Sequence, residues 1–324
     1  LFASKHFWTW HHDHFYSEDY WNKWTVPATR HLYVSRWQRR VLEDLIGQPT
    51  HGRVIYNGIP SAQFEAAEAR IKQHNGRRNP HTVAYASMPT RGLDRLLALW
   101  PDVRARVPDA KLLIYYGLHT VRQLWRGPYY DPFPLLQQLE AAISTLSKDG
   151  GVVFRGRVGQ LDLTEEFLQI GALAYPSAFP EVYMIAGVRA AAAGMKLVTT
   201  DTAALPETMP DVSYMVPHAV EQAAWDSGGR DAFTKTLIRA LTEPEDAYDR
   251  DAVAARTRRV CSWEGVARRV AESFDAAENG DDTFFQSDVG TEPRVVPSGP
   301  ADMRMPIPQS IEALRTETMA IRFA

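Results

Sequence analysis

The stretch YPSAFPEVYMIAGVRAAAAGMKLVTTDTAALPE, residues 175–207, decides the fold, because it contains the pattern of a strand, a helix and a second strand. The first strand is predicted at ALAYPS (172–177) and the second at KLVTTD (196–201). Between them Ile185 and Val188 begin an apolar pattern at helical spacing. Two strands joined through a helix are typical of a parallel β-α-β unit.

The same alternation extends over about 82–217. Further strands are predicted at VAYAS (83–87), KLLIYYG (111–117), VVFRG (152–156) and VSYMVP (212–217). Segments with helical periodicity separate them, which predicts a Rossmann-like α/β domain with a parallel sheet covered by helices on both faces. In such sheets ligands bind beyond the carboxyl ends of the strands. Candidate loops therefore begin near Ser87, Gly117, Gly156, Ser177 and Asp201.

The flanking segments indicate a second domain and a tail. Before the central region, strand ends are predicted in 7–14, 31–35 and 53–59, with a helix over 37–47 closed by Gly47. After it, helices are predicted over about 228–242, 246–260 and 263–277, followed by a segment rich in Gly, Pro, Asp and Ser. We therefore divide the chain into 1–57, the remainder of a first α/β lobe, 58–277, the Rossmann-like domain, and 278–324, a disordered tail.

Composition narrows the classes of function. The 324 residues carry a formal net charge of -3, which gives no global attraction to nucleic acid. The single cysteine, Cys261, cannot form an internal disulfide and fits a reducing, cytoplasmic compartment. No run of about 18 apolar residues predicts a membrane span, although peripheral contact at the inner membrane face is compatible with the sequence. The chain begins at Leu1, so we expect a piece of a longer protein.

The order and spacing of the segments 83–117, 152–167 and 175–207 resemble the nucleotide-sugar-binding domain of glycosyltransferase family 4, a family of retaining enzymes with the GT-B fold. The resemblance extends upstream through SRWQRR (35–40) and downstream to SWEGVARRV (262–270), so it covers roughly 1–275. It implies that most of the amino-terminal, acceptor-side lobe would precede residue 1.

A phosphate site is expected where the first central strand meets its helix. Arg91 and Gly92 lie at the start of the helix predicted over 92–106, where backbone N–H groups and the helix dipole favour anions. Arg91 matches the family's basic residue before glycine, and its guanidinium can bind phosphate. Taken without the resemblance, Arg91 would be a solvated helix-cap residue. Ser87, near the position of the family's second basic residue, is also expected to contact the donor.

The remaining donor contacts follow from the resemblance. Gly156, Arg157 and Val158 match the turn whose backbone contacts the base, although alone they would be an ordinary strand-to-helix turn. Family 4 carries two glutamates eight residues apart, the first near the donor sugar and the second at the ribose. Glu181 holds the first place, and Arg189, which has donors and no acceptor, holds the second. Eight residues are about two helical turns, so we expect both on one helix face. The residues between them that are expected to line the donor site are Val182, Tyr183 and Met184.

The run His11-His12-Asp13-His14 has two interpretations besides metal binding. Alternate residues of an extended strand share a face, so only His12 and His14 could converge on a metal, and we predict none. His12 and Asp13 match a His-Asp pair of the resembling family, which places His12 toward the donor sugar. Alternatively, these polar residues cap a strand whose tryptophans pack inside.

The sequence therefore predicts a retaining, metal-independent hexosyltransferase with His12, Arg91 and Glu181 in catalysis and no cofactor beyond the nucleotide sugar. The expected acceptor is a glycan or glycolipid, as in polysaccharide biosynthesis. The alternative, supported by Arg189 and by the missing part of the first lobe, is a non-catalytic nucleotide-sugar-binding remnant or scaffold of the same fold.

Overall fold

The computed structural model describes residues 6–13, 29–118, 121, 133–209, 214–217 and 222–286. The chain forms two compact units. Of the described residues, unit 1 contains 6–13, 29–58 and 264–286, and unit 2 contains 59–118, 121, 133–209, 214–217 and 222–263. Each unit has a parallel sheet and buried apolar side chains of its own.

Unit 2 is built on a six-stranded sheet in the order β6-β5-β4-β7-β8-β9. Every pair of neighbours runs parallel. The strand order reverses between β4 and β7, and in open α/β sheets a ligand crevice forms at such a reversal. The strands are β4 (Asn79–Ala86), β5 (Lys111–Tyr115), β6 (Val152–Gly156), β7 (Ile170–Tyr175), β8 (Lys196–Thr200) and β9 (Met215–Val216).

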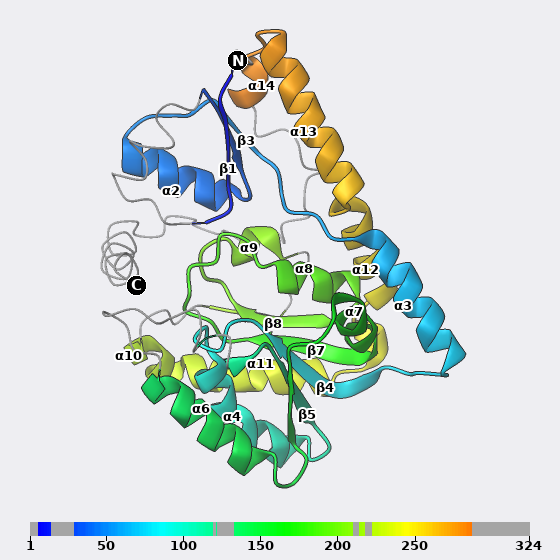
Figure 1. The fold of residues 1–324 in the computed structure, drawn as a ribbon. Coiled ribbons are helices and arrows are strands. Elements are labelled where there is room, and N and C mark those ends of the chain that lie inside the picture. The colour runs from blue at the N-terminus through cyan, green and yellow to red at the C-terminus, as the bar shows by residue number, and fades with distance from the viewer. Residues whose placement is uncertain are drawn as a thin grey trace. The chain divides into compact units, whose positions relative to one another are not determined.

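Helices cover both faces of this sheet. Figure 1 shows α7 (Gln160–Gln169) and α8 (Ile185–Ala192) on one face and α4 (Leu93–Arg106), α6 (Phe133–Leu146) and α11 (Arg230–Thr242) on the other. All residues of β7 and β8 are consequently buried. The parallel, doubly covered sheet predicted from the sequence is confirmed. The other helical segments are α3 (Ser61–Gln73), α9 (Leu205–Thr208), α10 (Gln222–Ala224), η2 (Trp225–Gly229), η3 (Glu245–Ala247) and α12 (Arg250–Val260).

Unit 1 contains a three-stranded parallel sheet in the order β1-β2-β3. The strands are β1 (Trp8–His11), β2 (Arg30–Tyr33) and β3 (Gly52–Val54). Helix α2 (Arg36–Ile46) begins after Ser35, whose side chain accepts a hydrogen bond from the backbone of Gln38, and ends at Gly47 in the left-handed conformation. The helix predicted over 37–47 is therefore confirmed, together with its glycine cap.

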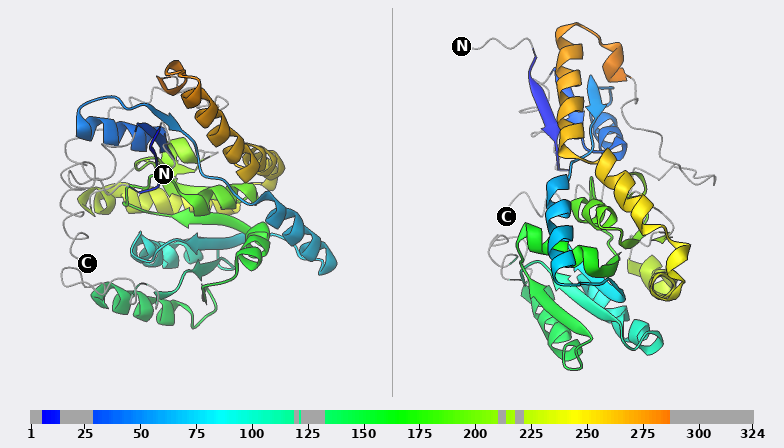
Figure 2. Two further views of the ribbon diagram at one scale, coloured as in Figure 1. Left: turned by 45° about the horizontal axis from the view of Figure 1, so that its top comes forward. Right: turned by 90° about the vertical axis from the view of Figure 1, so that its right-hand side faces the viewer.

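The end of the described chain belongs to unit 1. Figure 2 shows α13 (Trp263–Glu278) beside the strands of unit 1. Val266 and Val270 of this helix pack on the core residues Leu32 and Ile55. The sequence had placed 58–277 in a single domain. The structure differs because the apolar face of α13 is buried on the sheet of unit 1. The predicted tail at 278–324 begins with the short helix α14 (Thr283–Gln286), and residues 287–324 lie outside the described residues.

The two ends of the chain segment that forms unit 2 are neighbours in space. The backbone N–H of Ile59 donates to the carbonyl of Cys261 at 2.7 Å, and Ile59 and Ser262 form an isolated parallel bridge. The chain thus enters unit 2 beside the point where it leaves. Among the described helices, none is both long and apolar enough to cross a bilayer.

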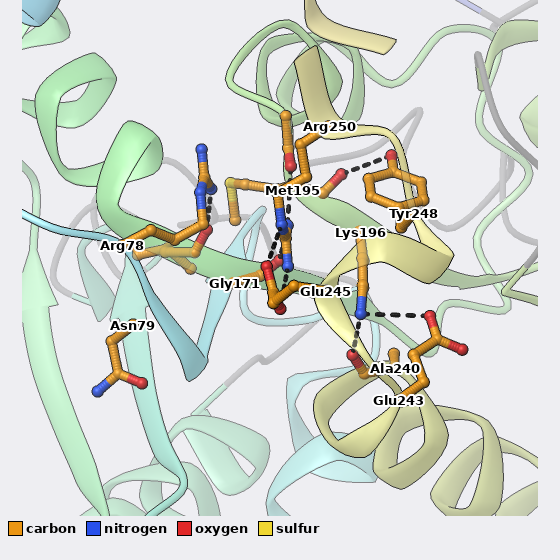
Figure 3. Close-up of polar contacts among 12 residues, drawn as sticks. Arg78, Asn79, Gly171, Met195, Lys196, Ala240, Glu243, Glu245, Tyr248 and Arg250 are labelled. Carbon is orange, nitrogen blue, oxygen red and sulfur yellow. Dashed lines mark hydrogen bonds and ion pairs between the residues drawn. The ribbon is translucent and has the colours of Figure 1, made fainter. Parts of the chain in front are cut away.

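Positively charged side chains bind backbone carbonyl groups near the amino-terminal ends of the strands of unit 2, as Figure 3 shows. Arg250 donates to the carbonyls of Gly171 at 3.0 Å and Gly194 at 2.8 Å. Lys196, only 1% exposed, donates to the carbonyl of Ala240 at 2.9 Å and lies 3.2 Å from Glu243 Oε1. Arg250 thus satisfies carbonyl groups where β7 begins and just after α8 ends, and Lys196 satisfies one in the last turn of α11.

Candidate functional site

The candidate site lies in unit 2, where the turn after β4 meets the loop after β7. Both segments follow the carboxyl ends of neighbouring strands at the reversal of strand order. The first carries Ser87, Arg91 and Gly92, and the second carries Glu181. The topology alone therefore brings four of the predicted site residues to one edge of the sheet.

Gly92 allows the two segments to approach closely. Its φ is +93°, and a Cβ atom at this position would lie 2.5 Å from the carbonyl oxygen of Pro176. A side chain would therefore clash with backbone and would also strain the left-handed conformation. The close approach that Gly92 permits is to the loop after β7, and the glycine places the N-terminus of α4 at the site.

Arg91 and Glu181 form an ion pair across the strand reversal. Arg91 Nη1 lies 2.8 Å from Glu181 Oε1, and the guanidinium carbon lies 3.8 Å from the ring centroid of Phe179. The hydroxyl of Tyr175 donates to the same carboxylate oxygen. Glu181 is 5% exposed, so this carboxylate is neutralised locally rather than by water.

The ion pair fixes the charge state of Arg91. Burial by itself would lower the pKa of Arg91, but the adjacent Glu181 carboxylate outweighs burial and raises it. Burial, reinforced by Glu181, raises the pKa of Tyr175, so its hydroxyl stays protonated and remains a donor. The site therefore presents a permanent cation beside a carboxylate, held in place by an aromatic ring and a phenol.

Two tyrosines position these groups, and the sequence analysis missed both. Tyr85 donates to the carbonyls of Met88 at 2.7 Å and Arg91 at 3.1 Å, which fixes the turn before α4. Tyr175 connects Glu181 to Ser87, whose Oγ lies 3.5 Å from the Tyr175 hydroxyl. A usable signal existed in the sequence, because Tyr175 ends its strand, Tyr85 lies one residue before the end of its strand, and a buried phenol needs a polar partner.

Arg189 lies apart from Glu181, which corrects the expectation that the two share a helix face. Helix α8 begins at Ile185, so Glu181 stands in the loop before it. The Arg189 guanidinium donates to neutral acceptors only, within the part of the chain that the structure describes. These acceptors are Gln63 Oε1 at 2.8 Å, Thr164 Oγ1 at 3.1 Å, and the side chain and backbone carbonyl of Gln160. Arg189 therefore ties α8 to α7 and α3.

The other predicted donor contacts fall into two groups. Gly156 ends β6 with a φ of +65° and is followed by the exposed Arg157 and the half-buried Val158. By contrast, the side chains of Val182, Tyr183 and Met184 are buried at 4–7% exposure. The turn from Gly156 to Val158 is therefore accessible at the carboxyl edge of the sheet. The side chains of residues 182–184 pack into unit 2, so a ligand could contact these residues mainly through their backbone.

His12 belongs to unit 1, whereas Arg91 and Glu181 belong to unit 2. It follows β1 directly and is exposed, and its ring lies 4.9 Å from that of Trp10. The carbonyl of Asp13 accepts a hydrogen bond from Gln38 at 2.9 Å. His14 lies outside the described residues. Among those described, His, Cys, Asp and Glu side chains form no group of three that could hold a metal ion.

No known family profile matches this chain, and no curated protein sequence is significantly similar to it. Solved structures nevertheless share its fold. HepE of Anabaena, solved with UDP and glucose, superimposes with a TM-score of 0.57 at 16% identity, over 83% of this chain and 71% of HepE. Sucrose-phosphate synthase of Thermosynechococcus elongatus gives 0.54 at 17% identity, over 84% and 68%.

A third similar structure is the α,α-trehalose 6-phosphate synthase of Burkholderia multivorans. It gives a TM-score of 0.61 at 15% identity, over 88% of this chain and 68% of the synthase. These similarities show the fold. The chain has the α/β architecture of the GT-B type, as its sequence predicted.

Proposed function

We propose that this chain is a glycosyltransferase, resembling family 4, that binds a nucleoside diphosphate sugar in unit 2 and transfers the sugar to a glycan or glycolipid acceptor with retention of configuration. The observation that carries the proposal is the pairing of Arg91 with Glu181 across the reversal of strand order. A cation suits a diphosphate and a carboxylate suits sugar hydroxyls. The fold shared with HepE, which was solved with UDP and glucose, supports the same ligand class.

The proposed chemistry requires positioning and charge stabilisation rather than a side-chain nucleophile. The bond between the anomeric carbon and the diphosphate oxygen breaks while an acceptor oxygen attacks from the same face, and the departing diphosphate takes the acceptor proton. Arg91 and the N-terminus of α4 would stabilise the charge that develops on the diphosphate. Glu181 would accept hydrogen bonds from the sugar and hold its anomeric carbon in place.

The remaining assignments are part of the same proposal. We assign His12 to the donor sugar, and we assign Ser87, Gly92 and the Gly156–Val158 turn to the nucleotide. No metal and no further cofactor are assigned. The proposed setting is the cytoplasm, with polysaccharide synthesis at the inner membrane face, where a lipid-linked acceptor would be encountered peripherally.

Calorimetric titration with UDP, GDP and ADP, with and without magnesium, tests the donor site. We expect one nucleotide to bind without metal. Arg91→Ala should weaken the binding of that nucleotide by about 1.5–3 kcal/mol, or roughly ten- to 150-fold in its Kd. This is the range for a hydrogen bond to a charged group.

Arg104→Ala is the matched control for Arg91→Ala. Arg104 lies at the other end of α4 and pairs with Asp149, and its side chain is 25% exposed against 28% for Arg91. Its removal should leave nucleotide affinity unchanged. A loss below about 0.5 kcal/mol in Arg91→Ala would place the phosphates elsewhere.

A second candidate function, a nucleotide-sugar-binding scaffold without catalysis, is favoured by Arg189. This buried arginine occupies the place of a family carboxylate, and its described partners are Gln63, Gln160 and Thr164. Hydrolysis or transfer of the bound nucleotide sugar separates the two candidates. Tight binding of the donor without release of free diphosphate, in the presence of acceptor glycans, would select the scaffold.

A further inference from the structure

Tyr116 adopts a backbone conformation that tyrosine rarely accepts. It follows β5 directly, with a φ of +89°. The other described non-glycine residues with positive φ are Asn75 and Ala203. Asparagine tolerates this region, whereas a bulky residue in the left-handed conformation is strained by its Cβ, which glycine lacks. Strain of this kind persists where the surrounding structure enforces it, and it gathers at functional sites.

The end of β6 holds Tyr116 in this conformation. The backbone N–H of Tyr116 donates to the carbonyl of Gly156 at 3.0 Å. The β5–β6 pairing also shifts its register between Ile114 and Tyr115, because β6 carries an extra residue between their partners Phe154 and Gly156. Tyr116 is therefore fixed beside the turn that begins at Gly156, at the carboxyl edge of the sheet.

Tyr116 lies at a place in the sheet that the base of a nucleotide could reach when its phosphates lie at Arg91. In the strand order, β5 is the neighbour of β4, after which Arg91 stands, and β6 is the next strand outward (Figure 1). Neighbouring strands are about 4.8 Å apart, so the ends of β5 and β6 lie roughly 5 and 10 Å from the end of β4. A base attached through ribose to a diphosphate at Arg91 would extend over that span.

The ring of Tyr116 is available for stacking. The residue is half-buried. No residue that the structure describes stacks on its ring or hydrogen-bonds to its hydroxyl. A flat aromatic side chain on which no described residue stacks, held at the carboxyl edge of the sheet by a strained backbone, suits a flat aromatic ligand.

We propose that Tyr116 is the platform on which the base of the nucleotide stacks. The inference rests on the proposed function, because it requires a nucleoside diphosphate with its phosphates at Arg91. Stacking on a tyrosine accepts any base, so Tyr116 contributes affinity, and the choice of base falls to other contacts such as the backbone after Gly156.

The test compares Tyr116→Gly with Tyr116→Phe in calorimetric titrations with UDP, GDP and ADP, and separately with pyrophosphate. Tyr116→Gly should weaken the nucleotide that binds the wild type by about tenfold, within the range for base–aromatic stacking, and should leave pyrophosphate affinity unchanged. Tyr116→Phe keeps the ring and should bind like the wild type. Because glycine relieves the strain, the urea midpoint of Tyr116→Gly should rise while its affinity falls.

Asn75→Gly is the control, since Asn75 also has a positive φ, of 51°, but lies in the turn after α3. It should not change nucleotide affinity. Undiminished nucleotide binding by Tyr116→Gly would overturn the proposal and leave the proposed function intact. Equal losses for nucleotide and pyrophosphate would also overturn it, because Tyr116 would then support the phosphates. A folded wild type that binds none of the three nucleotides would refute the proposed function itself.

Discussion

Replacing Gly92 with alanine tests how closely the two segments of the candidate site approach. Two costs add. The left-handed φ of +93° disfavours alanine by about 1–2 kcal/mol. The new Cβ would lie 2.5 Å from the Pro176 carbonyl oxygen, and relieving such overpacking typically costs about 1–3 kcal/mol. We therefore expect Gly92→Ala to lower the free energy of unfolding by about 2–5 kcal/mol.

Gly150→Ala isolates the first of these costs. Gly150 also lies in unit 2 with a positive φ, of +73°, but no atom lies within 4 Å of the position that its Cβ would take. Its replacement should cost only the dihedral term of about 1–2 kcal/mol. Urea unfolding of both variants measures the difference, and nucleotide titration should show a loss for Gly92→Ala alone. Equal destabilisation by the two substitutions would refute the close approach at Pro176.

Two further predictions concern buried titratable groups. His11 and His31 of unit 1 lie 3.2 Å apart through Nε2 and Nδ1, and burial lowers their pKa values from 6.5 to about 3 and about 4. Between pH 6.5 and 4 the unfolded state therefore binds more protons than the folded state. The free energy of unfolding of unit 1 should decrease as the pH is lowered through this range, by up to about 1.4 kcal/mol per pH unit for each histidine. Hydrogen exchange of the β1 and β2 amides at pH 7 and pH 5 measures this fall, and equal protection at both would contradict it. In unit 2, Glu243→Gln should destabilise more than Lys196→Met, because the first leaves a cation that is 1% exposed without its carboxylate, whereas Glu243 is 19% exposed and can be hydrated. Denaturant unfolding that ranks the two variants in the opposite order would contradict this reasoning.

The sequence predicted the sheet of unit 2 because the apolar side chains of its strands and helices follow regular periods. Even so, β4 begins at Asn79 rather than near Val83, because the first residues of the strand, Asn79 to Thr82, do not carry the apolar pattern from which a strand is predicted. The starts of β5, β6 and β8 coincide with the predicted ones, whereas the described strands of this sheet other than β6 end one or two residues before their predicted ends.

Contacts between residues distant in sequence were not predictable in this way. Arg189 was expected to face Glu181, but its partners come from α3 and α7, and no spacing rule links those helices to α8. The packing of α13 in unit 1 could not be predicted for the same reason. An amphipathic pattern shows that a helix buries one face, but it does not identify the surface that covers this face. Tyr85 and Tyr175 were missed because a buried phenol resembles any core aromatic residue until its partners are known.

The bridge between Ile59 and Ser262 brings the two ends of unit 2 together, so unit 2 has the form of an inserted domain. Its first residue is hydrogen-bonded to a residue two positions before its last, as in domains that are inserted into a host chain. Among the described residues, unit 1 is correspondingly assembled from chain on both sides of the insertion. Exchange of the whole of unit 2 would join residues 58 and 264 of unit 1 across a short gap, so unit 2 could be replaced by recombination without redesign of the sheet in unit 1.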